Sequence, residues 1–210
     1  MTAQEKIDKR EQLLLAAEFL FAEKGFDGTS VRDIAQRADV NLAMISYYFG
    51  SKEKLLQVLI EYRFASSLEL LDELVRNNEM TPWQKVEKLI EYYVNKILNG
   101  RRFHTIINQE YNTDRSREII DLITGIKMRN FGLIRQIIEE GVEKKVFRQV
   151  DPEMTMASMM GTINSTINSK NLYCTLFKID QGNEEEYLAK MKPRLTDHLK
   201  QMIHAHLLIQ

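Results

Sequence analysis

The sequence has little proline, glycine and cysteine, and each shortage narrows the fold. It contains only 3 proline and 9 glycine residues among 210, mostly at breaks in helical patterns. No stretch shows the clean alternation of a half-buried strand. The single Cys174 excludes an internal disulfide, as expected in a reducing compartment. These shortages predict an all-α protein in the cytoplasm.

Other absences exclude classes of function. No apolar run approaches the roughly 20 residues that span a bilayer, and the polar N-terminus has no secretory signal, so we expect no membrane partner. We find no Cys and His cluster with metal-ligand spacing, no nucleophile elbow and no glycine-rich phosphate loop. We therefore expect no metal, no cofactor and no catalytic residue. An enzyme that uses a C-terminal pocket stays open as an alternative.

Charge is nearly balanced, which limits how the chain can bind nucleic acid. The formal net charge is −1, and the first 62 residues carry 8 Lys and Arg against 10 Asp and Glu. A general positive field is therefore absent. If the protein binds nucleic acid, it does so through a small, well-placed patch.

Helical patterns with short breaks fill the first part of the chain. Gly25 ends the first pattern, Ser30 with Asp33 can cap the second, and Asn41 can cap the third. The predicted helices are Ile7–Lys24, Val31–Ala38, Leu42–Phe49 and Lys52 to about Asn78. The second and third are about eight residues long and are joined by a tight turn, which predicts a helix-turn-helix over about residues 30–49. Such a unit can bind DNA or serve only as a structural corner.

The rest of the chain predicts a larger helical bundle. "TPWQ" at Thr81–Gln84 signals a capped helix start, and the fourth helix bridges the two parts. The helix that starts at Thr81 is predicted to end at Gly100. The other predicted helices are Arg102–Tyr111, Ser116–Lys145, Asp151 to near Ser169, and one that begins at Asn183. We expect a DNA-binding domain over residues 1–55 and a regulatory and dimerisation domain over residues 56–210.

The pattern of the helix-turn-helix separates an inner from an outer face. With Ile34, Ile45 and Phe49 inward, the second helix of the helix-turn-helix, Leu42–Phe49, presents an outer face to a major groove. That face comprises Leu42, Ala43, Met44, Ser46, Tyr47 and Tyr48. Helix N-termini and basic side chains suit phosphate oxygens. The candidates for this role are Thr29, Ser30, Asn41, Lys52, Lys6 and Arg10. Lys6 and Arg10 alternate with acidic residues and can equally form a solvated helix start.

The stretch from Arg10 to Leu56 resembles the TetR family of transcriptional regulators. The resemblance rests on Ala16, Ala17, Phe21, Gly25, Phe26, Thr29, Ser30, Ile34, Ala35, Ala38, Val40, Ile45, Tyr47, Phe49 and Lys52. It implies an all-helical homodimer that binds a palindromic operator in double-stranded DNA, usually as a repressor. It also implies release from DNA by a small-molecule effector bound in the C-terminal domain. A DNA-bound regulator without an effector is the alternative.

The sequence departs from the family pattern at a few positions. Asp39 stands where glycine is commonest in the turn, and Asp tolerates a left-handed backbone. Ser46 and Tyr48 replace a frequent Tyr and a frequent His. Leu42 offers no hydrogen bond to a base edge, so we expect Leu42, Ala43 or Met44 to contact thymine methyl groups.

Two further sets of residues are candidates for C-terminal functions. Aromatic bodies with polar handles suit a ligand site, although each is also a candidate for the core. They are Trp83, Tyr93, Phe103, His104, Asn108, Tyr111, Phe131, Met160 and Asn164. A row of small residues and the last helix suit a two-fold interface, or else packing within one chain. They are Ala157, Gly161, Ser165, Leu195, Leu199 and Met202.

Overall fold

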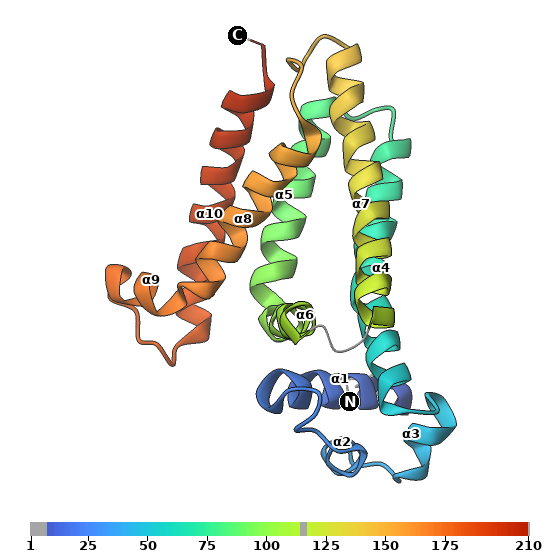
Figure 1. Cartoon of the computed structure of the whole chain (residues 1–210). Helices are drawn as coiled ribbons and strands as arrows, with labels where there is room; N and C mark the ends of the chain where they lie inside the picture. The colour runs from blue at the N-terminus through green and yellow to red at the C-terminus, as the bar shows by residue number, and fades with distance from the viewer. Residues whose placement is uncertain (1–7, 114–116, 210) are drawn as a thin grey trace, which may run out of the picture. The chain divides into compact units, whose positions relative to one another are not determined.

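The structure is a computed structural model that describes residues 8–113 and 117–209. In this part the chain forms only helices, with one isolated antiparallel bridge between Phe147 and Leu208. The helices are α1 Lys9–Lys24, α2 Val31–Arg37, α3 Ala43–Tyr48, α4 Lys52–Arg76, α5 Pro82–Asn99, α6 Arg101–Thr113, α7 Arg117–Glu143, α8 Pro152–Asn168, α9 Lys170–Phe177 and α10 Glu184–Leu207 (Figure 1). The predicted all-α class is confirmed. None of the helices in the described residues is both long and apolar enough to cross a membrane.

The chain packs into two compact units. Unit 1 comprises the described residues up to Ser66 together with Arg102–Ile126. Unit 2 comprises Ser67–Arg101 and the described residues from Lys127 onward. Helices α4 and α7 therefore each contribute residues to both units, and unit 1 is discontinuous in sequence.

Unit 1 has an apolar core to which α1 contributes a stripe of buried residues. The stripe predicted on α1 is inward, and Leu13, Leu14 and Ala17 are completely buried. Buried residues from α2, α3, the start of α4, α6 and the start of α7 complete this core. They are Ile34, Ala35, Ile45, Phe49, Leu55, Leu56, Leu59, Ile60, Phe103, Ile106, Ile107, Ile119 and Ile123.

Unit 2 is built around α5, which contacts both α8 and α10, and α8 and α10 lie side by side (Figure 1). The predicted cap at Thr81 is present, because its side chain accepts from the Gln84 amide while the Gln84 side chain accepts from the Thr81 amide. Asp151 likewise caps α8 through the Met154 amide at 2.9 Å. The caps therefore fix where α5 and α8 begin.

A buried ion pair joins two helices of unit 2. The Lys85 ammonium on α5 lies 2.7 Å from the Glu140 carboxylate on α7, and the Lys85 side chain is only 1% exposed. Burial by itself raises the pKa of Glu140, but hydrogen bonds from Lys144 and Lys85 outweigh it and lower that pKa. The carboxylate therefore stays charged and compensates the buried ammonium.

One helix was not expected from the sequence. Helix α9 follows α8 with only Ser169 between them, so no glycine or proline marks its start. It ends at Phe177, and the next residue, Lys178, adopts a left-handed conformation with φ of 54°. Because neither glycine nor proline marks the break between α8 and α9, the sequence pattern did not predict it.

Two glycines of α7 provide a matched test of this packing. A Cβ on Gly141 would lie 2.0 Å from the Phe147 ring, which is buried, whereas a Cβ on Gly132 meets nothing within 4 Å. We expect Gly141→Ala to lower the free energy of unfolding by about 1–3 kcal/mol through overpacking. Gly132→Ala should raise it by up to about 1 kcal/mol through helix propensity. Urea unfolding measures both, and equal stability of the two variants would contradict the placement of Phe147 against α7.

Candidate nucleic-acid interface

The first helix of the predicted helix-turn-helix begins with a complete capping box. The Ser30 hydroxyl accepts from the Asp33 amide at 3.1 Å, and the Asp33 carboxylate accepts from the Ser30 amide at 3.0 Å. The Ser30 hydroxyl also donates to this carboxylate, and these bonds lower the pKa of Asp33. The cap fixes the start of α2 and leaves Ser30 exposed beside it.

The turn between α2 and α3 is tight and needs one left-handed residue. Asp39 supplies it with φ of 52°, as its tolerance of that conformation predicts. The amide of Val40 then donates to the Ala35 carbonyl at 3.1 Å. The departure from glycine at this position is therefore accommodated by the fold.

Helix α3 presents a narrower outer face than the sequence predicts. Asn41 caps it, because its side-chain oxygen accepts from the Ala43 amide at 2.8 Å. Leu42 and Tyr47 are 42% and 79% exposed, and Ala43 and Ser46 are also exposed.

The two other residues predicted for this face lie partly inward. Met44 and Tyr48 are half-buried against the core of unit 1, so only part of each side chain is available on the outer face for which both were candidates. The ring of Tyr48 lies edge-on to that of Tyr47, with 5.0 Å between the centroids. Tyr48 thus supports Tyr47 from one side.

Two predicted phosphate contacts lie differently from expectation. Thr29 is only 1% exposed, and its hydroxyl lies 3.1 Å from the Leu20 carbonyl and 2.8 Å from the Gly25 carbonyl. The Lys52 ammonium donates to the carbonyls of Phe26 and Thr29. The expectation that the Thr29 hydroxyl faces a phosphate is corrected, since that hydroxyl is buried within the fold.

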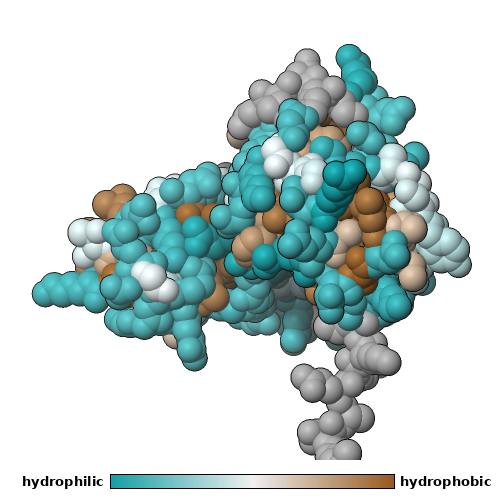
Figure 2. Space-filling view, turned by 90° about the horizontal axis from the view of Figure 1, so that it is seen from below, coloured by the Kyte–Doolittle hydropathy of each residue, from teal (hydrophilic) through white to brown (hydrophobic). Residues whose placement is uncertain are grey.

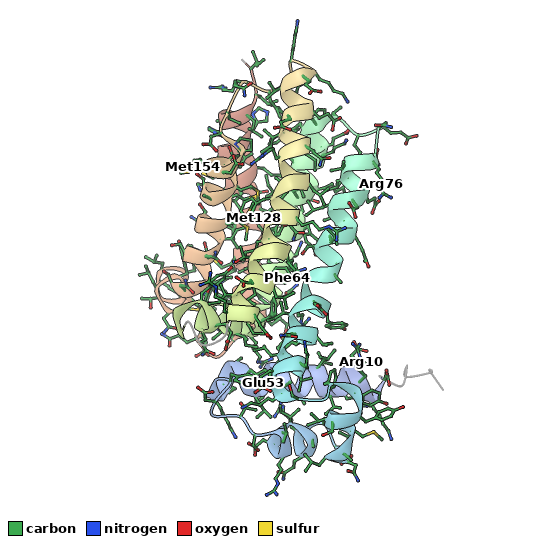
Figure 3. All side chains as sticks on the ribbon, turned by 45° about the vertical axis from the view of Figure 1, so that its right-hand side comes forward. Arg10, Glu53, Phe64, Arg76, Met128 and Met154 are labelled. Atoms are coloured by element: carbon green, nitrogen blue, oxygen red, sulfur yellow. The ribbon has the colours of Figure 1, made fainter. Side chains whose placement is uncertain are left out.

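Of the remaining basic candidates, Arg10 lies in the first turn of α1. Arg10 is exposed, and its guanidinium lies 5.7 Å from the centre of the Phe49 ring at the end of α3. Figure 3 labels Arg10 at the start of α1 and Glu53 in the first turn of α4. Lys6 lies outside the described residues. Arg10 is thus the predicted α1 cation that the structure places beside α3.

The outer face of α2 was not among the predicted DNA contacts. Arg32 and Gln36, which are four residues apart, are both exposed on this helix. The i, i+4 spacing of polar residues opposite the buried Ile34 and Ala35 was the signal that identifies them. Figure 2 shows a mostly hydrophilic surface interrupted by small hydrophobic patches.

Helix α1 is attached to α4, α2 and α6 by polar contacts. Tyr62 donates to Glu11 at 2.6 Å, which raises the pKa of Tyr62, and Arg63 pairs with the buried Glu18 at 2.5 Å. The Phe19 ring receives two guanidinium groups. Those of Arg37 and Arg102 lie 3.3 Å and 4.9 Å from its centre. These contacts fix α1, on which the interface helices pack, to α2, α4 and α6.

The nine predicted ligand residues do not gather in one unit. Phe103, His104, Asn108 and Tyr111 belong to α6 in unit 1, where Phe103 is buried in the core. The other five belong to unit 2.

Within unit 2 the predicted ligand residues are also spread out. Trp83 packs edge-on against His204, with 4.9 Å between the ring centroids. Tyr93 lies ten residues further along α5, about 15 Å away, and burial raises its pKa. Met160 and Asn164 of α8 are half-buried, as is Phe131 of α7.

The predicted dimer residues divide into exposed and buried sets. Ala157, Gly161 and Ser165 are exposed on α8. Leu195 and Leu199 are 5% and 0% exposed and pack in the core of unit 2, and Met202 is half-buried. Leu195 and Leu199 are thus corrected to core residues, because their stripe of α10 faces inward.

The described residues contain no group of three or more His, Cys, Asp or Glu that could hold a metal ion. Cys174 is buried. The interface itself offers exposed hydroxyl, amide, apolar and guanidinium groups, the kinds of group that bind DNA in helix-turn-helix proteins.

A capped helix, a tight turn and a short exposed second helix define the class of helix-turn-helix DNA-binding proteins. Residues 13–59 match the family described as "Bacterial regulatory proteins, tetR family", and residues 79–168 match "Tetracyclin repressor-like, C-terminal domain". The HTH-type transcriptional repressor NicS of Pseudomonas putida is 31% identical over 192 residues, which cover 89% of this chain and 90% of that protein. The chain belongs to the TetR family of DNA-binding transcriptional regulators.

Solved structures share the fold at lower identity. The ketosteroid transcriptional regulator KstR2 of Mycobacterium tuberculosis has a TM-score of 0.74 at 17% identity, over 100% of both chains. FadR from Bacillus subtilis, solved with stearoyl-CoA, has a TM-score of 0.68 at 22% identity, over 92% of this chain and 99% of that one. The expected fold of a helix-turn-helix unit with a larger C-terminal helical part is therefore confirmed.

The exposure of Tyr47 leads to a testable prediction. Because its side chain is 79% exposed, Tyr47→Ala should leave the free energy of unfolding within about 0.5 kcal/mol of wild type. Operator affinity should fall by about tenfold or more, because a groove contact is lost. Tyr48→Ala serves as the control, because the loss of its half-buried ring should lower the free energy of unfolding. A Tyr47→Ala variant that unfolds easily would place Tyr47 in the core instead.

Proposed function

We propose that this protein is a homodimeric repressor that binds a palindromic operator in double-stranded DNA and is released by a small-molecule effector. The observation that carries the proposal is the exposed outer face of α3, a helix that starts beside the Asn41 cap and packs on the core of unit 1. Residues 1–55 act as the DNA-binding domain, and residues 56–210 act in regulation and dimerisation. A cytoplasmic location and the absence of enzymatic activity belong to the same proposal.

The proposed DNA contacts follow from exposure. Leu42, Ala43, Ser46 and Tyr47 contact base edges in the major groove, with thymine methyl groups opposite the apolar side chains. Met44 and Tyr48 reach the groove only with their exposed edges. Ser30, Asn41 and Arg10 lie beside backbone phosphates. We add Arg32 and Gln36 of α2, which are exposed on the helix that precedes the turn.

The proposed dimer uses the small exposed face of α8. Ala157, Gly161 and Ser165 repeat every four residues, so they form one row along the helix. Small side chains in a row allow a second helix to approach closely. The same face on two copies gives an isologous, two-fold interface. Figure 3 labels Met154 in the first turn of this helix, where its side chain is 62% exposed. This methionine can extend the apolar contact.

The proposed effector is an apolar or amphipathic small molecule that binds in the C-terminal domain. Unit 2 contains a cavity of about 20 Å³ lined by apolar residues that include Met156 and Met159. Ligand sites are typically about 300–1,000 Å³, so binding requires side chains to move, and methionines repack readily. Asn130 Oδ1 is buried and has no hydrogen-bond partner within the described residues. FadR, which shares the fold, was solved with an amphipathic thioester, stearoyl-CoA.

Effector control follows from linkage. An effector that binds more tightly when the recognition helices are mis-spaced must weaken DNA binding by the same factor. A regulator without an effector would show the same DNA contacts and no such response.

Selection of sheared genomic DNA on the purified protein tests DNA recognition. We expect a recurring palindrome whose half-sites lie about one helical turn, roughly 34–36 Å, apart. Selection should be repeated at two salt concentrations, because phosphate contacts make affinity salt-dependent. Recovery of DNA without any sequence preference at either salt would contradict operator recognition by a dimer.

Gly161 offers a direct test of the dimer. A Cβ at Gly161 meets no atom within 4 Å of its own chain, so Gly161→Leu should leave the helical content unchanged. It should nevertheless convert the dimer to a monomer in analytical ultracentrifugation, because the bulky side chain keeps the partner helix away. Gly132→Leu on α7, another open position, is the control that should remain dimeric. A dimeric Gly161→Leu variant would exclude this face.

A further inference from the structure

The first residue of α4 points its charge into the loop that precedes α2. The Lys52 ammonium donates to the Phe26 carbonyl at 2.8 Å and to the Thr29 carbonyl at 2.9 Å. The same nitrogen lies 4.1 Å from the centre of the Phe26 ring. An ammonium group has three N–H donors, so two of them are committed within the chain.

The same loop is fixed from its other side by α1. The buried Thr29 hydroxyl lies within hydrogen-bond distance of the carbonyls of Leu20 and Gly25, at the C-terminal end of α1. Ser30, the next residue, is the N-cap of α2. The backbone at residues 26–30 therefore joins the end of α1, the start of α2 and the start of α4.

We propose that Lys52 is a positioning residue that sets the start of α2 relative to the first turn of α4, and that it does not neutralise a DNA phosphate. Hydrogen bonds from a charged donor are stronger than neutral ones. Swinging the ammonium out to a phosphate would break both part-buried hydrogen bonds, which is unfavourable. The Phe26 carbonyl would keep only the Thr29 amide as its donor. A displacement of the first turn of α4 is passed through Lys52 to α2 and so to α3. This inference rests on the proposed function, in which α3 reads an operator.

A neighbouring lysine provides a matched control. Lys54 lies in the same turn of α4 and is exposed, and its ammonium donates to the Gln57 side chain at 2.8 Å. Lys52→Met and Lys54→Met remove the same charge and keep a similar chain length. Only Lys52→Met removes the link to the α1–α2 loop.

Hydrogen exchange of the free protein tests the link without DNA. We expect the amides of residues 26–31 to exchange several-fold faster in Lys52→Met than in wild type or Lys54→Met, with unchanged helical content. Lys52→Arg keeps the charge but replaces the compact ammonium with a planar fork, so it should also speed exchange in this loop. Should Lys52→Met fail to fold, Lys52→Arg decides the matter alone. Wild-type exchange in Lys52→Arg, or in a folded Lys52→Met, overturns the proposal.

DNA binding gives the second, independent arm. We expect Lys52→Met and Lys52→Arg each to weaken binding to the selected operator by about tenfold. Affinity for scrambled DNA and the slope of log affinity against log salt should stay at their wild-type values. A phosphate contact predicts the opposite: equal losses on both DNAs in Lys52→Met, a salt slope smaller by about 0.9, and wild-type binding in Lys52→Arg. Wild-type protein that prefers no sequence would overturn the proposed function, while exchange in the loop still decides the role of Lys52.

Discussion

The short length of α2 and α3 is the constraint on which the interface depends. Helices of 7 and 6 residues are far below the roughly 12–15 residues that an isolated helix needs in water. They persist because Ile34, Ala35, Ile45 and Phe49 pack on α1 and α4 in one core, and because caps satisfy their first amides. The brevity of α3 is what leaves its outer side chains free of other helices.

Unit 2 differs from unit 1 because its helices are long and its core contains side chains that repack readily. Its core is large and apolar, and methionines of α8 and α10 lie in it. The Lys85–Glu140 pair fixes α5 to α7 inside this unit. A rigid ion pair combined with flexible side chains is compatible with a site that opens for an amphipathic effector.

Much of the fold was predictable because the local signals were strong. The boundaries of α1, α2 and α5 followed from Gly25, the Ser30 cap and the Thr81 cap, which act within a few residues. The inward side of α3 followed from its periodicity. Helix α9 escaped because Ser169 alone separates it from α8. The roles of Thr29 and Lys52 were not predicted because all but one of their carbonyl partners lie 9 to 26 residues away in sequence. Leu195 and Leu199 were assigned to the wrong surface because a helix with one apolar stripe does not reveal which neighbour covers it.

The discontinuity of unit 1 sets limits on how such a chain can be recombined. Phe103, Ile106, Ile107, Ile119 and Ile123 belong to the core that supports the interface, although α5 and the end of α4 separate them from it in sequence. Arg102 likewise lies over the Phe19 ring of α1. A fragment cut after α4 would expose these apolar surfaces to water. A chimera that joins unit 1 to the C-terminal domain of another regulator must therefore include α6 and the first turns of α7. Such a chimera needs more than one junction in the chain.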